Sequence, residues 1–185
     1  MIYFVRHGET DYNKAGKAQG HMDIPLNEVG LSQAQETADK LKDVDIDMIY
    51  SSPLKRARVT ADIVNKYHNV KVVEDDRLRE LYLGNRQGVV LKDCSKEEIA
   101  EFLRDPKKFG AESYEELCSR VEEIYKEIEL VAKDKNVLIV SHGGVYRAIV
   151  RYMLGIDNVH SENIHSLKNC EVVNFSEMVK GMDLG

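Results

Sequence analysis

Two histidines with small or cationic neighbours are the residues best suited to chemistry in this chain. His7 follows Arg6 and precedes Gly8, and His142 precedes the pair Gly143-Gly144. An imidazole can attack a phosphorus atom, an arginine binds phosphate oxygens, and a glycine lets the backbone approach a ligand. These residue types together predict phosphoryl transfer through a histidine.

Each histidine comes directly after a short β-rich run, residues 2–5 before His7 and residues 137–140 before His142. Strands are therefore predicted over 2–6 and 137–141, with others over 47–51, 70–73 and, at an edge, 171–175. Ligands of parallel sheets bind beyond the carboxyl ends of the strands, so we expect His7, Ser52 and His142 to share one rim.

Helical patterns separate the predicted strands. Asn27 and the Ser52-Pro53 pair are predicted helix caps, and Ser113 with Glu116 forms a predicted capping box. The helices are expected over 31–41, 53–66, 95–105, 113–133 and 143–154, the first with an apolar stripe of Leu31, Ala34, Ala38 and Leu41. The polar stretch 7–28 is predicted to be one long loop.

Strands that alternate with helices predict an α/β fold, a three-layer α/β/α sandwich with a mostly parallel central sheet. We expect a single domain over 1–185, with a small helical lid formed by an insertion at roughly 82–133. Phe102, Phe109 and Tyr114 are candidates for the mouth of the site.

The composition of the chain excludes some classes of binding partner. The chain has 185 residues and a net charge of -6, which argues against nucleic acid or an anionic membrane as the main partner. No stretch approaches the roughly 20 apolar residues of a membrane span. We expect a cytoplasmic monomer or homodimer that acts on a small molecule. Its three cysteines, Cys94, Cys118 and Cys170, have no metal-ligand spacing and are expected to be free thiols.

At this point the chain resembles the histidine phosphatase superfamily, which includes cofactor-dependent phosphoglycerate mutases and acid-type phosphatases. The resemblance rests on four motifs and a fifth segment, in family order: Arg6-His7-Gly8-Glu9-Thr10 with Asn13; Gln19-Gly20 through Asp23-Ile24-Pro25-Leu26 to Gly30; Ser51-Ser52-Pro53-Leu54-Lys55-Arg56-Ala57 with Thr60-Ala61; Leu78-Arg79-Glu80-Leu81; and Ser141-His142-Gly143-Gly144.

The resemblance implies a role for each matching residue. His7 would be the nucleophile, kept neutral by cationic neighbours. Arg6 and Arg56 would clamp the phosphoryl oxygens, because guanidinium forks match phosphate geometry. His142 would donate a hydrogen bond to the transferring group. Glu80 would protonate the leaving alkoxide and later deprotonate water, with Glu9 as a rival acid.

Four further residues are predicted substrate contacts. Asn13 and Gln19 resemble secondary phosphate contacts, and Gly143 offers a backbone N–H at the start of its helix. Arg86, with Arg79, is a candidate for a second anionic group of the substrate. Other residues receive structural roles: Arg58 is expected to be a surface charge, Ser141 lacks the setting of a serine nucleophile, and the remaining histidines, His21, His68, His160 and His165, match no motif. No metal and no cofactor are predicted.

The motifs are shared by phosphatases and mutases, so we use the length of the segment between the acid and the second histidine to choose between them. About sixty residues separate Glu80 from His142, fewer than in the family's mutases, whose extra segments enclose the site. A smaller lid leaves a phosphohistidine open to water, so hydrolysis of small phosphomonoesters is favoured. A phosphoglycerate mutase and an α-ribazole phosphate phosphatase remain alternatives, and a phosphate-binding module without turnover is the rival from another class.

Overall fold

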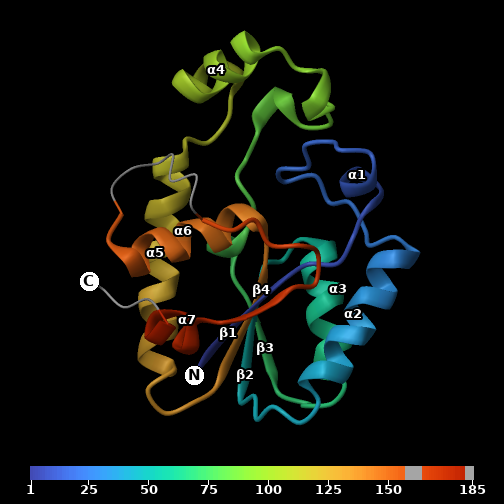
Figure 1. The fold of residues 1–185 in the computed structure, drawn as a ribbon, viewed down its shortest axis with the longest axis vertical. Coiled ribbons are helices and arrows are strands. Elements are labelled where there is room, and N and C mark those ends of the chain that lie inside the picture. The colour runs from blue at the N-terminus through green and yellow to red at the C-terminus, as the bar shows by residue number, and fades with distance from the viewer. Residues whose placement is uncertain (157–163, 182–185) are drawn as a thin grey trace.

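A five-stranded sheet forms the centre of the computed structural model, which describes residues 1–156 and 164–181 (Figure 1). Its strands are β1 (Ile2–Arg6), β2 (Met48–Ser51), β3 (Lys71–Glu74), β4 (Val137–Ser141) and β5 (Val172–Asn174). They lie in the order β3-β2-β4-β1-β5, all parallel except β5, which pairs antiparallel with β1 at the edge. The predicted fold class and the edge strand are confirmed.

Helices cover both faces of the sheet. On one face lie α2 (Glu28–Leu41) and α3 (Lys55–Asn65), and on the other lie α5 (Tyr114–Val131), α6 (Gly143–Leu154) and α7 (Phe175–Gly181). Alternate residues of β4 enter different cores, since Leu138 and Val140 pack with α2 and α3, whereas Val137 and Ile139 pack with α5 and α6. This period of two is what a strand buried on both sides requires.

Local sequence sets the ends of the helices, with three differences from expectation. Asn27 caps α2 by accepting from Gly30 N at 2.8 Å, as predicted, but Leu31 is 45% exposed and Thr37 is buried on the inner face. Helix α3 begins at Lys55 rather than at Pro53, so Ser52 is not its cap. The predicted long loop also contains a short helix, α1 (Asp11–Lys14), because Thr10 and Asn13 form a capping box.

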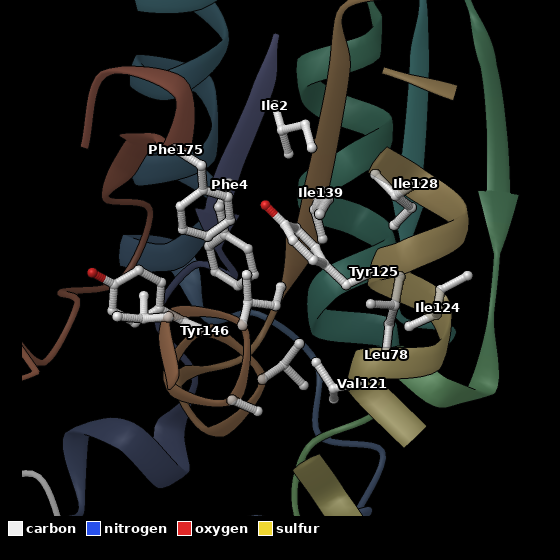
Figure 2. Packing of buried hydrophobic residues seen from close by; sticks show 14 of the residues in the cluster. Ile2, Phe4, Leu78, Val121, Ile124, Tyr125, Ile128, Ile139, Tyr146 and Phe175 are labelled. Carbon is white, nitrogen blue, oxygen red and sulfur yellow. The ribbon is translucent and has the colours of Figure 1, made fainter. Parts of the chain in front are cut away.

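Helix α5 belongs to the core rather than to a lid. Its residues Val121, Ile124 and Ile128 face Phe4 and the sheet (Figure 2), and each buried aliphatic side chain contributes about 1.5–3 kcal/mol. The predicted lid insertion over 82–133 therefore extends too far at its C-terminal end, because it includes α5. The part outside the sandwich, residues 82–113, is called the lid segment below; it holds α4 (Lys96–Arg104) and several 3₁₀ turns.

The register of the strands brings distant residues to one rim. Arg6 pairs with Ser141 across β1 and β4, and Ser51 pairs with Val140 across β2 and β4. The chain then leaves all three strands at the same edge, with His7 N donating to Ser141 O at 2.9 Å and Ser52 N to Val140 O at 3.1 Å. No helix of the described residues is long and apolar enough to cross a membrane.

Candidate active site

His7 lies at the carboxyl end of β1 with its ring almost fully buried, 2% exposed. Its Nδ1 is 2.7 Å from the carbonyl oxygen of Gly8. A carbonyl oxygen only accepts, so Nδ1 carries the proton, and Nε2 of the neutral ring keeps its lone pair. The backbone thus orients His7 with Nε2 as its nucleophilic atom.

His142 lies in the turn between β4 and α6 and is fully buried. Its ring centroid is 5.1 Å from that of His7, with the two planes tilted by 60°. Its Nε2 lies 2.8 Å from Oγ of Ser52, whereas its buried Nδ1 has no hydrogen-bond partner among the described residues. The two imidazoles predicted from the sequence to converge are therefore adjacent.

Both rings are held in the neutral form. Burial lowers the pKa of His7 and of His142 well below the usual value of 6.5, and the charge of Arg56 lowers both further. A neutral ring is what a nucleophile needs, because a protonated imidazole has no lone pair to offer.

Two guanidinium groups supply positive charge to this cluster. Arg56, in the first turn of α3, is fully buried and donates from Nη1 to Met22 O at 2.7 Å and from Nη2 to Gly20 O at 2.8 Å. Arg6, the last residue of β1, donates from Nη1 to Leu167 O at 2.5 Å. Burial lowers the pKa of both, that of Arg56 to about 10, so Arg56 stays charged at neutral pH.

The Nε groups of both arginines are also buried without a partner within residues 1–156 and 164–181. Buried donors of this kind cost free energy unless an acceptor is present. Together with Nδ1 of His142 they form a set of unpaired nitrogens beside the two rings. Such a set fits a tetrahedral oxyanion such as phosphate.

Glu80 is held by two backbone amides. Its Oε1 accepts from Gly144 N at 3.1 Å and from Leu81 N at 2.9 Å, and its charge favours the protonated forms of Arg6 and Arg56. A Cβ on Gly144 would lie 2.2 Å from Oε1, so this carboxylate needs a glycine at the start of α6. Glu80 thus reaches the histidine cluster, as predicted.

The other predicted contacts divide into two groups. Asn13 and Gln19 are joined through Thr10, whose Oγ1 lies 3.0 Å from Asn13 Oδ1 and 2.9 Å from Gln19 Oε1. Gly143 is the first residue of α6, as expected. Arg86 instead lies within the lid segment, its guanidinium 5.3 Å from the ring centroid of Phe109.

Four residues without a predicted catalytic or substrate-binding role also lie at the site. Ser52 contacts His142, Asn169 Nδ2 donates to His7 O at 2.9 Å, and His21 Nε2 lies 2.7 Å from Glu80 O. The Arg120 guanidinium also donates to Glu80 O, at 2.9 Å. No motif marks Asn169 or Arg120, because each arrives from a distant element through the fold.

The remaining sequence expectations concern residues outside the cluster. Arg58 pairs with Asp62 and Glu74 at the surface, as predicted, and the buried Ser141 hydroxyl donates to Leu78 O at 2.7 Å. Phe102 and Phe109 pack on each other, with centroids 5.5 Å apart. His160 lies outside the described residues. Within the described part of the chain all three cysteines are free, and no group of three or more His, Cys, Asp or Glu side chains could hold a metal ion.

Comparison with known proteins agrees with this geometry. PhoE of Bacillus subtilis, named an uncharacterized phosphatase, is 39% identical over 158 residues, 84% of this chain and 78% of the relative. GpmB of Proteus mirabilis, named a probable phosphoglycerate mutase, is 32% identical over 93% of this chain and 82% of the relative. The solved structure of a mycobacterial glucosyl-3-phosphoglycerate phosphatase is 29% identical with a TM-score of 0.78, covering 92% of this chain and 87% of that one.

The whole described sandwich falls within one family match. Residues 2–181 match the histidine phosphatase superfamily (branch 1), and that span includes every residue of the cluster described above. The chain belongs to the histidine phosphatase superfamily.

Proposed function

We propose that this protein is a phosphomonoesterase that hydrolyses small phosphorylated metabolites through a phosphohistidine at residue 7. The observation that carries the proposal is the pairing of two neutral imidazoles, 5.1 Å apart, with two buried arginines whose Nε groups are unpaired. A nucleophile and three hydrogen-bond donors for one tetrahedral anion are thereby gathered in a buried site.

In the first step Nε2 of His7 attacks the phosphorus atom and the phosphorus–oxygen bond of the ester breaks. Glu80, in its protonated form, gives its proton to the leaving alkoxide. Arg6, Arg56 and His142 bind the equatorial oxygens, where charge accumulates.

In the second step Glu80 takes a proton from water, and that water attacks the phosphorus atom of phospho-His7. The phosphorus–nitrogen bond breaks, and the electron pair returns to Nε2. Inorganic phosphate leaves, and Glu80 is protonated again for the next turnover. Both steps use the same residues, so one cluster serves both halves of the reaction.

Transfer of the phosphoryl group to water is favoured over its transfer back to a substrate, because few residues are available to enclose the site. Eighteen residues between Glu80 and His142 form α5, whose inner face packs in the core. The lid segment is what remains to cover the cluster, and a poorly covered phosphohistidine is accessible to water. A phosphoglycerate mutase and an α-ribazole phosphate phosphatase are the alternatives within the same chemistry.

Asn13, Gln19 and the Gly143 N–H complete the proposed phosphate and substrate contacts. The two candidate arginines for a second anionic group already have partners: Arg79 pairs with Asp76 at 2.6 Å, and Arg86 stacks on Phe109. We therefore expect activity on neutral as well as acidic phosphomonoesters.

The test is a screen of about a hundred phosphorylated metabolites in which free phosphate is measured with and without a chelator. We expect turnover in both conditions and inhibition by vanadate. His7→Ala should reduce kcat/KM on the order of 10⁴-fold or more, since the nucleophile is lost. His68→Ala, in the turn after α3, is the matched control and should keep activity.

Two outcomes would count against the proposal. Phosphate binding with no release from any substrate would make the protein a binding module. Interconversion of phosphoglycerate isomers faster than phosphate release, in a coupled assay with a bisphosphate primer, would make it a mutase.

A further inference from the structure

The proton of the His142 ring must be on a particular nitrogen if this residue is to help the reaction. Nε2 is occupied by the contact with Ser52, so Nδ1 is the nitrogen left for a phosphoryl oxygen. A neutral imidazole carries one proton, and with that proton on Nε2 the ring would offer a lone pair to an anion. The cluster therefore requires the tautomer with hydrogen on Nδ1.

Ser52 is placed to select that tautomer. It is fully buried, and its Oγ accepts a hydrogen bond from Leu54 N at 3.3 Å. The hydroxyl hydrogen then has one acceptor within reach among the described residues, Nε2 of His142 at 2.8 Å. A hydroxyl that donates to Nε2 leaves the ring proton on Nδ1.

We propose that Ser52 is a positioning residue that donates its hydroxyl hydrogen to Nε2 of His142 and so keeps Nδ1–H directed at the transferring phosphoryl group. This inference rests on the proposed function for its chemical meaning. The sequence predicts that Ser52 caps a helix and lies on the same rim as His142, and the proposal adds a hydrogen bond that requires a hydroxyl at this position.

The other groups that act on the ring favour its neutral state and do not choose between tautomers. Burial lowers the pKa of His142 most, and Arg56 from α3, His7 just after β1, Arg6 and His21 lower it further. Protonation of both nitrogens is thus disfavoured, and the hydroxyl of Ser52 decides which nitrogen is protonated.

Ser51 provides a matched control. It is equally buried and adjacent in sequence, but its Oγ donates to the carbonyl oxygen of Ser52 at 2.9 Å rather than to a histidine. Ser51→Ala and Ser52→Ala each remove one buried hydroxyl at the carboxyl end of β2. A purely structural role would make the two variants alike.

The first measurement is ¹⁵N NMR of the wild-type protein with labelled histidine at neutral pH. We expect His142 to show a protonated Nδ1 and an unprotonated Nε2. In Ser52→Ala the proton should redistribute toward Nε2, whereas Ser51→Ala should keep the wild-type pattern. A wild-type ring with its proton on Nε2 would overturn the proposal, even if no variant folds.

The second measurement is the single-turnover rate of His7 phosphorylation. Ser52→Ala should reduce this rate and kcat at least about tenfold, with a smaller change in KM, because the lost tautomer acts in the transition state. Ser52→Thr, which keeps the hydroxyl, should recover activity relative to Ser52→Ala.

A Ser52→Ala rate within twofold of Ser51→Ala would contradict the proposal. If the wild-type protein releases no phosphate from any substrate, the proposed function fails instead, and the NMR result still decides the role of Ser52.

Discussion

The carboxyl edge of the sheet and the lid segment hold their polar groups in different ways. At the edge His7, His142 and Arg56 are at most 2% exposed and are fixed by backbone carbonyls or a buried hydroxyl. In the lid segment α4 has no buried residue, and its charges pair at the surface, as Lys108 does with Glu101. Exposed pairs of this kind contribute about 0–1 kcal/mol.

This difference separates a rigidly held edge from a weakly held lid segment. The proposed catalytic groups lie at the edge, which is fixed by three strands, whereas exposed surface pairs hold the lid segment. We therefore expect large kinetic effects from small changes at the edge and small effects from charge removal in the lid segment.

After loss of the nucleophile itself, the largest expected effect comes from Arg56→Lys, compared with Arg58→Lys two residues later. Lysine keeps the charge but loses the fork that holds Gly20 O and Met22 O and the Nε donor, so kcat/KM should fall about 10²–10³-fold. Arg58 pairs with Asp62 at the surface, and its variant should keep wild-type kinetics. Steady-state assays on nitrophenyl phosphate measure kcat/KM for both variants. Equal values would show that the buried guanidinium of Arg56 does not contribute to catalysis.

A smaller effect is expected from Gly144→Ala, because the new Cβ would displace the Glu80 carboxylate. Loss of general acid catalysis should slow alkyl phosphates about 10²-fold, with less effect on nitrophenyl phosphate, whose leaving group needs no proton. The comparison between the two substrates is the control, because the same variant is measured on both. Similar losses on both substrates would remove Glu80 as the acid.

The pH dependence of the free energy of unfolding should report the protonation of the two buried histidine rings. Burial lowers the pKa of His7 and His142 in the folded protein, so below about pH 6.5 the unfolded chain binds protons that the folded one does not. The free energy of unfolding should fall with decreasing pH, by up to about 1.4 kcal/mol per pH unit for each ring, and should lose this dependence above about pH 7.5.

Urea unfolding at pH 7.5, 6.5 and 5.5 measures that slope. The double variant His7→Gln/His142→Gln should have a shallower slope than the wild type. An unchanged slope would mean that these rings are not held neutral.

The smallest effect is expected from Arg86→Ala in the lid segment. Loss of the contact with Phe109 should cost about 0.5–1 kcal/mol of stability. The ratio of kcat/KM for acidic over neutral phosphomonoesters should not change. A selective loss of activity on acidic substrates would show that Arg86 contacts the substrate, and would weaken the contrast between the two regions.

Sequence patterns predict the strands and the two histidines because both follow from local residue order. Residues 2–6 and 137–141 have apolar side chains at nearly every position, as strands buried on both faces do. Arg56 lies within the predicted helix 53–66, although that helix begins at Lys55.

Other features depend on contacts that residue order does not contain. The amphipathic pattern of 113–133 is the same for a lid helix and for a core helix, and packing against β1 and α6 decides the latter. Ser52 has the sequence of a helix cap, and its contact with His142, 90 residues away, exists only in the fold.

Identification of the phosphorylated atom tests the central claim most directly. Glu80→Gln should slow the second step enough for rapid quenching at high pH to trap the phosphoenzyme, and ³¹P NMR of the trapped protein distinguishes the two ring positions. Since Nδ1 of His7 is bound to Gly8 O, we predict phosphorus on Nε2 of His7. Phosphorus on Nδ1, or phosphate release with no phosphohistidine at residue 7, would contradict the account.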